Sequence, residues 1–196
     1  VTAGYYSVLL KDYNIKAELT ATKRVSFHRY HFPAGQEAHI IFDIGNRQGE
    51  TGPVKDAKVY MLPDGRVEGF VTTLPLYVQK YQPGGEVSMY FSAVIDAKSS
   101  THGVFKKKEI KQADSISGAG AGLYLSFDDK KERSVTIKIG LSYTSIANAR
   151  LNLEAEAAPL GFDVAKIIAH RTWEKYLGRI KVETKNEKDK IKFYTG

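Results

Sequence analysis

The feature that most constrains the fold of this chain is the regular alternation of apolar and polar residues in its early part. In Ile15–Thr22 (IKAELTAT) every second residue is apolar. A period of two is typical of a β-strand with one buried face. Val25–Phe32 follows and ends at Pro33, and it carries bulky side chains on both faces near its end. That pattern favours a strand covered on both sides, or one with a bulge.

Similar segments recur as far as about Tyr143. Further strands are predicted at Tyr5–Leu10, Ala38–Ile44, Val54–Leu62, Arg66–Val71, Leu76–Tyr81, Glu86–Ile95, Gly103–Ile110, Leu123–Phe127 and Ser134–Tyr143. The sharpest turn signal is Pro63-Asp64-Gly65, in which Pro fixes φ and Gly accepts a positive φ. Many short strands separated by turns predict a mainly β fold, either an antiparallel sandwich or a barrel.

The composition changes after Tyr143. Ser145–Ala158 is rich in Ala, Leu and Glu and is followed by Pro159, which predicts a helix with a stop. A second helix is predicted at Asp163–Leu177, with Asp163 as its N-cap and Gly178 in a left-handed C-cap. Its expected apolar face consists of Ala165, Ile168, Ala169, Trp173, Tyr176 and Leu177.

The two ends of the chain suggest a fragment of a longer protein. The sequence opens with Val1 and enters a predicted strand at once. A brief strand is predicted at Ile180–Glu183, and the sequence then stops within a predicted third helix, Lys188–Tyr194. No apolar run approaches the roughly 18–20 residues that a membrane span needs. Because there is no cysteine, disulfides and thiolate metal sites are excluded, while the cellular compartment stays open.

The net charge of +7 permits a nucleic-acid partner. The basic residues are spread along the chain among 22 acidic ones, however, whereas nucleic-acid binding calls for a clustered patch. The Lys106–Lys108 run and the Lys-rich tail keep a basic nucleic-acid binder as a minor hypothesis, which predicts salt-dependent affinity.

The candidate chemical motifs are weak when each is compared with its ordinary structural role. His28 and His31 are three apart on a predicted strand, so they point to opposite faces and do not share a metal ion. Asp128-Asp129 and the pair Glu154 and Glu156 are sequence neighbours, whereas acid–base hydrolysis needs two carboxyl groups facing each other across a cleft. Gly118–Gly122 lacks the Lys-Ser/Thr of a phosphate loop.

Three ordered segments resemble glycoside hydrolase family 92, a family of bacterial exo-acting α-mannosidases. Gly4–Pro33 with Ala38–Ile44 resembles the amino-terminal β-sandwich of that family. Ile139–Glu183 is similar to the stretch that leaves the sandwich and enters the linker helices. Lys192–Gly196 (KFYTG) is similar to the opening of the helical catalytic barrel.

The resemblance implies an antiparallel β-sandwich, supersandwich-like, over residues 1–143, truncated at its amino terminus. Residues 144–196 would be a short α-helical linker leading into a missing (α/α)6 catalytic barrel. The parent enzyme would remove terminal α-linked mannose with inversion and with the aid of calcium, and a periplasmic or extracellular location is expected. Its acid, base and calcium ligands would lie in the barrel.

Accordingly, no residue of this chain is assigned a catalytic, substrate-binding or metal-binding role, and the chain alone is expected to be inactive. Arg24, His28, Arg29 and Tyr30 match a family motif and are interpreted as sandwich framework. Thr72–Tyr81 departs from the family pattern because it lacks a Gly-Trp element, so the linkage specificity does not follow from the resemblance.

The expected partners are an α-mannoside glycan, bound through the parent enzyme, and the missing barrel itself. One alternative of another class is a self-standing carbohydrate-binding or scaffolding module. The 11% aromatic content allows this module, but β-sheet cores also select aromatic residues. The predicted helix with Trp173 argues against it, because its apolar face needs a neighbour to cover it.

Overall fold

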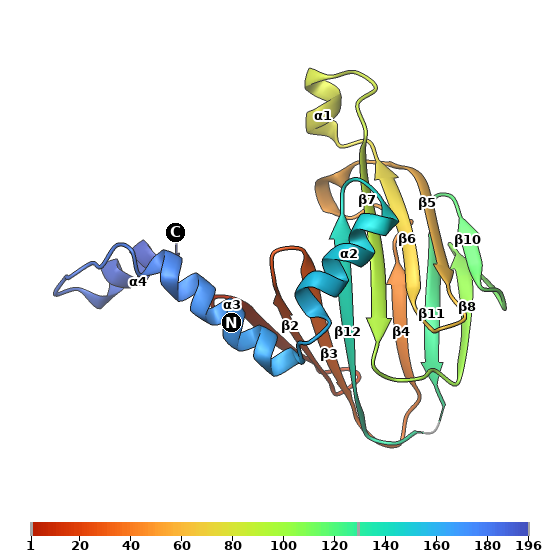
Figure 1. Ribbon diagram of the computed structural model, residues 1–196, viewed down its shortest axis with the longest axis horizontal. Coiled ribbons are helices and arrows are strands. Elements are labelled where there is room, and N and C mark those ends of the chain that lie inside the picture. Colours follow the sequence, from red (N-terminus) through yellow and green to blue (C-terminus); the bar gives the residue numbers. More distant parts are fainter. Residues whose placement is uncertain (1, 129, 196) are drawn as a thin grey trace.

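Two antiparallel sheets form the body of the protein in the computed structural model, which describes residues 2–128 and 130–195 (Figure 1). The larger sheet has the strand order β1-β2-β3-β12-β7-β6-β5-β10. Its strands are β1 (Tyr5–Leu10), β2 (Ile15–Ala21), β3 (Val25–Phe32), β5 (Val54–Met61), β6 (Val67–Thr73), β7 (Val87–Ile95), β10 (Ser115–Ser117) and β12 (Arg133–Ser142). The smaller sheet, in the order β4-β11-β8-β9, contains β4 (Ala38–Asp43), β11 (Ala121–Phe127), β8 (Thr101–Lys106) and β9 (Glu109–Lys111).

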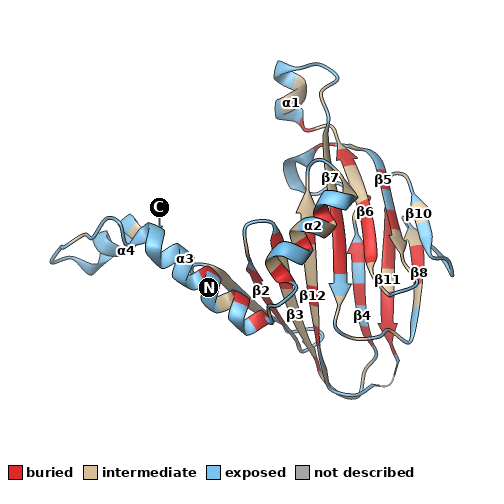
Figure 2. Cartoon of the chain, viewed as in Figure 1, coloured by how far each residue is buried: buried red, intermediate tan, exposed pale blue. Residues whose placement is uncertain are grey.

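The main apolar core lies between these two sheets. It combines alternate residues of both, among them Phe91 and Ile137 of the larger sheet and Phe42, Leu123 and Phe127 of the smaller one. Figure 2 shows the buried positions concentrated on the facing strands. The predicted mainly β fold is therefore confirmed, with the sandwich as its form.

Helices cover the outer face of the larger sheet. α2 (Ile146–Ala157) lies over β12 and β7, and α3 (Phe162–Leu177) contacts β1, β2 and β3 (Figure 1). The remaining helices are the 3-10 turn η1 (Gly49–Thr51), α1 (Leu76–Tyr81) and α4 (Glu187–Thr195). None of the helices in the described residues is long and apolar enough to cross a membrane.

A second, smaller core joins α2 and α3 to this outer face. Val25 and Phe27 of β3 pack there against Leu153 of α2 and Phe162 of α3. α2 lies very close to the backbone of β12 at Gly140. A Cβ atom added to Gly140 would lie 2.3 Å from the carbonyl oxygen of Ala149 in α2. β3 is thus covered on both faces, which explains the bulky residues on both sides of its sequence.

Several predicted elements follow the sequence pattern closely. The turn at Pro63-Asp64-Gly65 joins β5 and β6, with Gly65 at φ +85°. Ser145 is the N-cap of α2, where its Oγ accepts a hydrogen bond from the Asn148 amide at 3.1 Å. The predicted third helix is present as α4.

Other predictions are wrong. Leu76–Tyr81 is a helix and not a strand: Pro75 precedes its first turn, and the Gln79 side chain hydrogen-bonds the backbone of Gly84 and Gly85. The predicted strand Gly103–Ile110 is interrupted at Lys107, which has φ +57°, so that β8 and β9 form a hairpin.

The predicted ends of the second helix also need correction. α3 begins at Phe162 after Gly161, so Asp163 lies in the first turn and is not the N-cap. Gly178 has φ −73°, so it is not in the left-handed conformation. Residues 180–183 form no strand.

Candidate functional site

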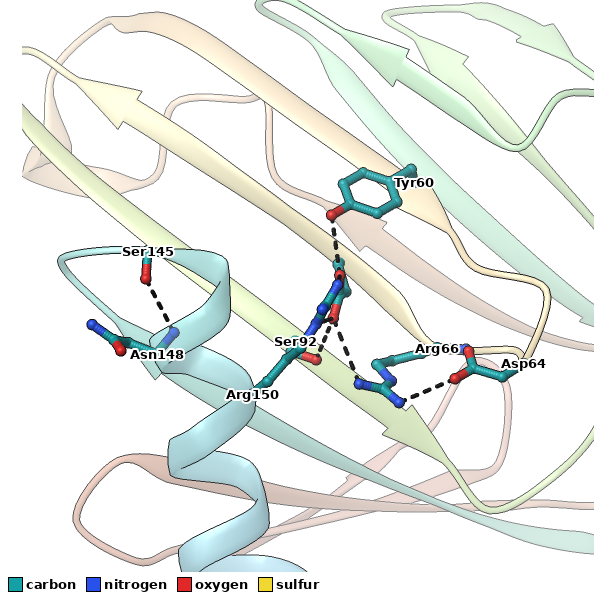
Figure 3. A network of polar contacts seen from close by, with 8 residues as sticks. Tyr60, Asp64, Arg66, Ser92, Ser145, Asn148 and Arg150 are labelled. Atoms are coloured by element: carbon teal, nitrogen blue, oxygen red, sulfur yellow. Dashed lines mark hydrogen bonds and ion pairs between the residues drawn. The ribbon is translucent and has the colours of Figure 1, made fainter.

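Glu68 is the most completely buried charged residue in the described part of the chain, and it links the sandwich to α2. Its carboxylate accepts hydrogen bonds from Nε and Nη2 of Arg150, each at 2.5 Å. Ser92 Oγ and Tyr60 OH donate to it at 2.9 and 3.0 Å. Figure 3 shows Tyr60, Ser92 and Arg150 converging from two strands and the helix.

The electrostatics of this cluster favour the ionised carboxylate. Burial acts to raise the pKa of Glu68, but the hydrogen bonds from Arg150, Ser92 and Tyr60 outweigh it and hold the pKa below its ordinary value. The same contact with Glu68 raises the pKa of Arg150. Two-pronged binding of a carboxylate by a guanidinium fixes orientation as well as distance. The ion pair of Glu68 and Arg150 therefore fixes the position of the first turns of α2 on the larger sheet.

A second carboxylate, that of Glu156, ties the other end of α2 to the turn between β2 and β3. It accepts hydrogen bonds from Thr22 Oγ1 at 2.6 Å, from the Arg24 amide at 3.0 Å and from Arg24 Nε at 2.6 Å. Burial acts to raise the pKa of Glu156, and these three donors lower it overall. α2 is thus held at both of its ends.

A third carboxylate, Glu18 of β2, organises the contact with α3. It accepts hydrogen bonds from Tyr5 OH at 2.6 Å and Arg29 Nε at 2.9 Å, and it lies 2.6 Å from His31 Nε2. Burial opposes the ionised form, but these contacts hold the pKa of Glu18 far below its usual range.

Arg29 connects Glu18 on the larger sheet to the first turn of α3. Its Nη1 donates to Asp163 Oδ2 at 3.0 Å, and its guanidinium lies 4.2 Å from the centre of the Phe162 ring. A guanidinium that is both ion-paired and stacked on an aromatic ring has little freedom to turn. α3 is therefore attached to the sheet through its amino-terminal turn.

Glu18, Glu68 and Glu156, which we call the three anchors, are suited to holding helices and not to transferring protons. A general acid for glycoside hydrolysis needs a raised pKa and a free face towards the substrate. Each anchor has a lowered pKa and at least three polar contacts. Their chemistry is that of a fixed structural joint.

The residues discussed from the sequence fall into two groups. Arg24 and Arg29, interpreted as framework, contact the anchors and so connect the sandwich to the helices. His28 and Tyr30 lie on the opposite face of β3, where His28 Nδ1 is 2.9 Å from the Tyr30 hydroxyl, and burial lowers the pKa of His28.

His28 and His31 thus have separate surroundings, with His31 on the Glu18 side of β3. Asp129 of the Asp128-Asp129 pair lies outside the described residues. Within residues 2–128 and 130–195, no three His, Asp or Glu side chains are grouped as a metal site requires.

The anchors were not identified from the sequence. Their partners are distant in the chain: Glu68 and Arg150 are 82 positions apart, and Arg24 and Glu156 are 132 positions apart. The available signal was a charged residue within an otherwise apolar stretch, as in VEGFV around Glu68 and ANARLNL around Arg150. That signal shows that a partner is needed but does not say which one.

Two sequence-family models match the regions that the Glu68–Arg150 contact connects. The sequence model of the glycosyl hydrolase family 92 N-terminal domain matches residues 1–142. The model of the family's catalytic domain matches residues 148–196. The chain belongs to glycosyl hydrolase family 92. No curated protein matches the sequence.

Solved structures of the same family have the same fold. The α-mannosidase BT3965 of Bacteroides thetaiotaomicron matches with a TM-score of 0.80 and 24% identity, over 92% of this chain and 24% of that one. The glycosyl hydrolase ccman5 matches with a TM-score of 0.72 and 26% identity, over 86% of this chain and 21% of that one.

The inverting mannosidase BT2199 of Bacteroides thetaiotaomicron gives a TM-score of 0.73 at 20% identity, over 91% of this chain and 23% of that one. This chain thus spans about a quarter of the length of these structures. The predicted division between residues 143 and 144, and the prediction that catalytic, substrate and metal residues lie elsewhere, stay predictions.

Proposed function

We propose that this chain is the non-catalytic supporting part of an exo-acting α-mannosidase. In this proposal the sandwich carries and orients the first helices of the catalytic domain, and the hydrolysis of terminal α-mannosides is inverting and calcium-dependent. The catalytic groups and calcium ligands belong to a part of the enzyme outside these residues. Support comes from family membership and from relatives described as α-mannosidases, one of them as an inverting mannosidase.

The proposal depends on one observation above the others, the contact between Arg150 and Glu68. Arg150 lies in the region that matches the catalytic-domain model, and Glu68 lies in the region that matches the N-terminal model. Their two hydrogen bonds of 2.5 Å join the two matched regions through a buried carboxylate. A supporting domain requires a joint of this kind, because small displacements of catalytic elements lower the reaction rate strongly.

The nature of the ligand is supported by one relative in particular. A structure of BT3965 in complex with mannoimidazole matches this chain with a TM-score of 0.80. That compound binds to the relative, and for this chain it supports a mannoside as the glycan met by the whole enzyme.

The test is a comparison of the chain with a full-length enzyme that contains it. The purified 196-residue chain is expected to release no mannose from an aryl α-mannoside or from α-mannobiose in the presence of calcium. The full-length enzyme is expected to release it and to lose that activity on chelation by EGTA. Calcium-dependent turnover by the chain alone would contradict the proposal, as would a full-length enzyme that is inactive on every α-mannoside.

A further inference from the structure

One end of the sandwich contains an open hollow with a volume of about 300 Å³. Its floor is the inner face of β6 and β7, where Val71 pairs with Met89 and Thr73 with Val87 across the strands. Cross-strand partners share a face, so these four side chains form one continuous surface. α1 and the amino-terminal end of α2 lie at this same end of the molecule (Figure 1).

Two exposed tyrosine side chains line the hollow. Tyr77 of α1 is 63% exposed, and Tyr143, just after β12, is 70% exposed. Tyr143 is the first residue after β12, and its side chain lines the hollow together with Val71 and Met89 of the floor. A tyrosine ring presents an apolar face and a hydroxyl group, which suits a ligand with both kinds of surface.

Four polar groups around the hollow are uncommitted, whereas a fifth, the Thr51 hydroxyl, accepts a hydrogen bond from the Gln48 amide at 3.3 Å. The Glu50 carboxylate, the Thr73 hydroxyl and the hydroxyls of Tyr77 and Tyr143 make no hydrogen bond or ion pair with any residue that the structure describes. The three anchors, by contrast, are fully engaged with their partners. A sugar ring has C–H faces that pack on aromatic rings and hydroxyl groups that hydrogen-bond to carboxylates and alcohols.

One residue that lines the hollow falls between the two matched regions of the sequence. Tyr143 stands between residue 142, where the N-terminal match ends, and residue 148, where the catalytic match begins. A volume near 300 Å³ is at the lower end of the range for small-molecule sites, which suits a single sugar unit.

We propose that this hollow is a glycan subsite on the sandwich, which holds one neutral sugar unit of an α-mannoside between Tyr77 and Tyr143. Glu50 and Thr73 accept or donate hydrogen bonds to the hydroxyl groups of that unit. The identity of the sugar rests on the proposed function. The site itself rests on the two exposed rings, the free polar groups and the volume.

The experiment is a titration of the 196-residue chain with α-mannobiose, followed by amide NMR shifts. We expect saturable shifts confined to residues 71–77, 87–89 and 143. Tyr77→Ala and Tyr143→Ala should each raise Kd about 3-fold to 10-fold, since a stacked ring contributes about 0.5–1.5 kcal/mol. Tyr143→Phe keeps the ring and should change Kd less than Tyr143→Ala.

Tyr13→Ala is the matched control, because Tyr13 is 62% exposed and lies in the turn after β1, outside the hollow. It should leave Kd unchanged. A separate groove is lined by Arg24, Trp173 and Tyr176. The subsite is overturned if no saturable shift occurs, if Tyr13→Ala weakens binding as much as Tyr77→Ala, or if the shifts map to that groove.

Two further outcomes separate this inference from the proposed function. An equal response to maltose would overturn the assignment to mannosides. If α-mannobiose does not bind to the chain, the subsite is overturned. The test of the proposed function, which compares mannose release by the full-length enzyme and by the chain, does not depend on that result.

Discussion

The sandwich and the α3–α4 arm of the same chain are stabilised in different ways. In the sandwich, large side chains such as Phe127 and Leu123 are fully buried between two sheets. In the arm, α4 has no buried residue among those described, and α3 buries only Phe162, Ala165 and Ala169. Figure 2 shows this contrast directly, with buried strands beside a largely exposed arm.

The difference shows how one chain can contain both a self-sufficient body and an element positioned from outside. Burial of apolar surface dominates the stability of the sandwich. The helices are located by the three anchors. Arg150, the partner of Glu68, and Asp163, which Arg29 links to Glu18, both lie early in the helical region. Trp173 and Tyr176, further along α3, are about half exposed and contribute much less buried surface.

The largest effect is expected when one large aromatic side chain is replaced by alanine in each of the two regions. Phe127→Ala should lower the free energy of unfolding by about 3–5 kcal/mol, because it leaves a cavity in the inter-sheet core. Trp173→Ala, the matched change in the arm, should cost less than about 1 kcal/mol. Urea unfolding followed by circular dichroism measures both. Equal losses would mean that the arm is part of the same core.

A somewhat smaller effect is expected when the Glu68 anchor is broken. Arg150→Met leaves a buried carboxylate without its main partner and should cost about 2–4 kcal/mol of unfolding free energy. The double change with Glu68→Gln should recover part of that loss, because no charge is then buried.

Arg66→Met is the control for this experiment, since Arg66 Nη1 is 4.0 Å from Glu68 Oε1 and its Nη2 is paired with the exposed Asp64. It should cost less than about 1 kcal/mol. If Arg66→Met is as destabilising as Arg150→Met, the link between the sandwich and α2 is not specific to Arg150.

The smallest effect concerns pH. The pKa values of Glu18, Glu68 and Glu156 are lowered in the folded protein, so their ionised forms stabilise it. That contribution is complete above the ordinary carboxyl pKa of about 4.3, and it is lost as the pH falls from there towards the lowered values. Unfolding free energies measured at pH 7 and pH 3.5 should therefore differ.

Glu156→Gln should reduce this difference by up to about 1 kcal/mol, because Glu156 is partly exposed and its charge is screened. Glu154→Gln is the neighbouring control, since Glu154 is exposed and has no hydrogen-bond partner in the described residues. A difference between pH 7 and pH 3.5 that is the same in Glu156→Gln and in the unsubstituted chain would show that this anchor does not stabilise the ionised form.

Local patterns allowed most of the sandwich to be predicted from the sequence. The alternation in Ile15–Ala21 and the turn at Pro63-Asp64-Gly65 each specify their structure within a few residues. The segment Leu76–Tyr81 misled the prediction because its six apolar and polar residues fit a strand as well as a short helix. There the hydrogen bonds of the Gln79 side chain to the following loop decide the structure.

The candidate sites were much less predictable. The hollow brings together η1, α1, the strands β6 and β7 and the end of β12, so no short window of sequence contains it. The anchors likewise depend on contacts between strands and helices distant in the chain. Such contacts follow from the three-dimensional arrangement, and a single sequence without homologues gives no direct measure of it.

The contact of Arg150 with Glu68 has a practical consequence for engineering. A hybrid enzyme that joins this sandwich to the catalytic domain of another family member would bring a foreign helix against a carboxylate with no access to water. Unless that helix supplies a guanidinium in the same place, the hybrid would bury an isolated charge. The crossover should therefore be placed after α2, so that both members of the pair come from one parent.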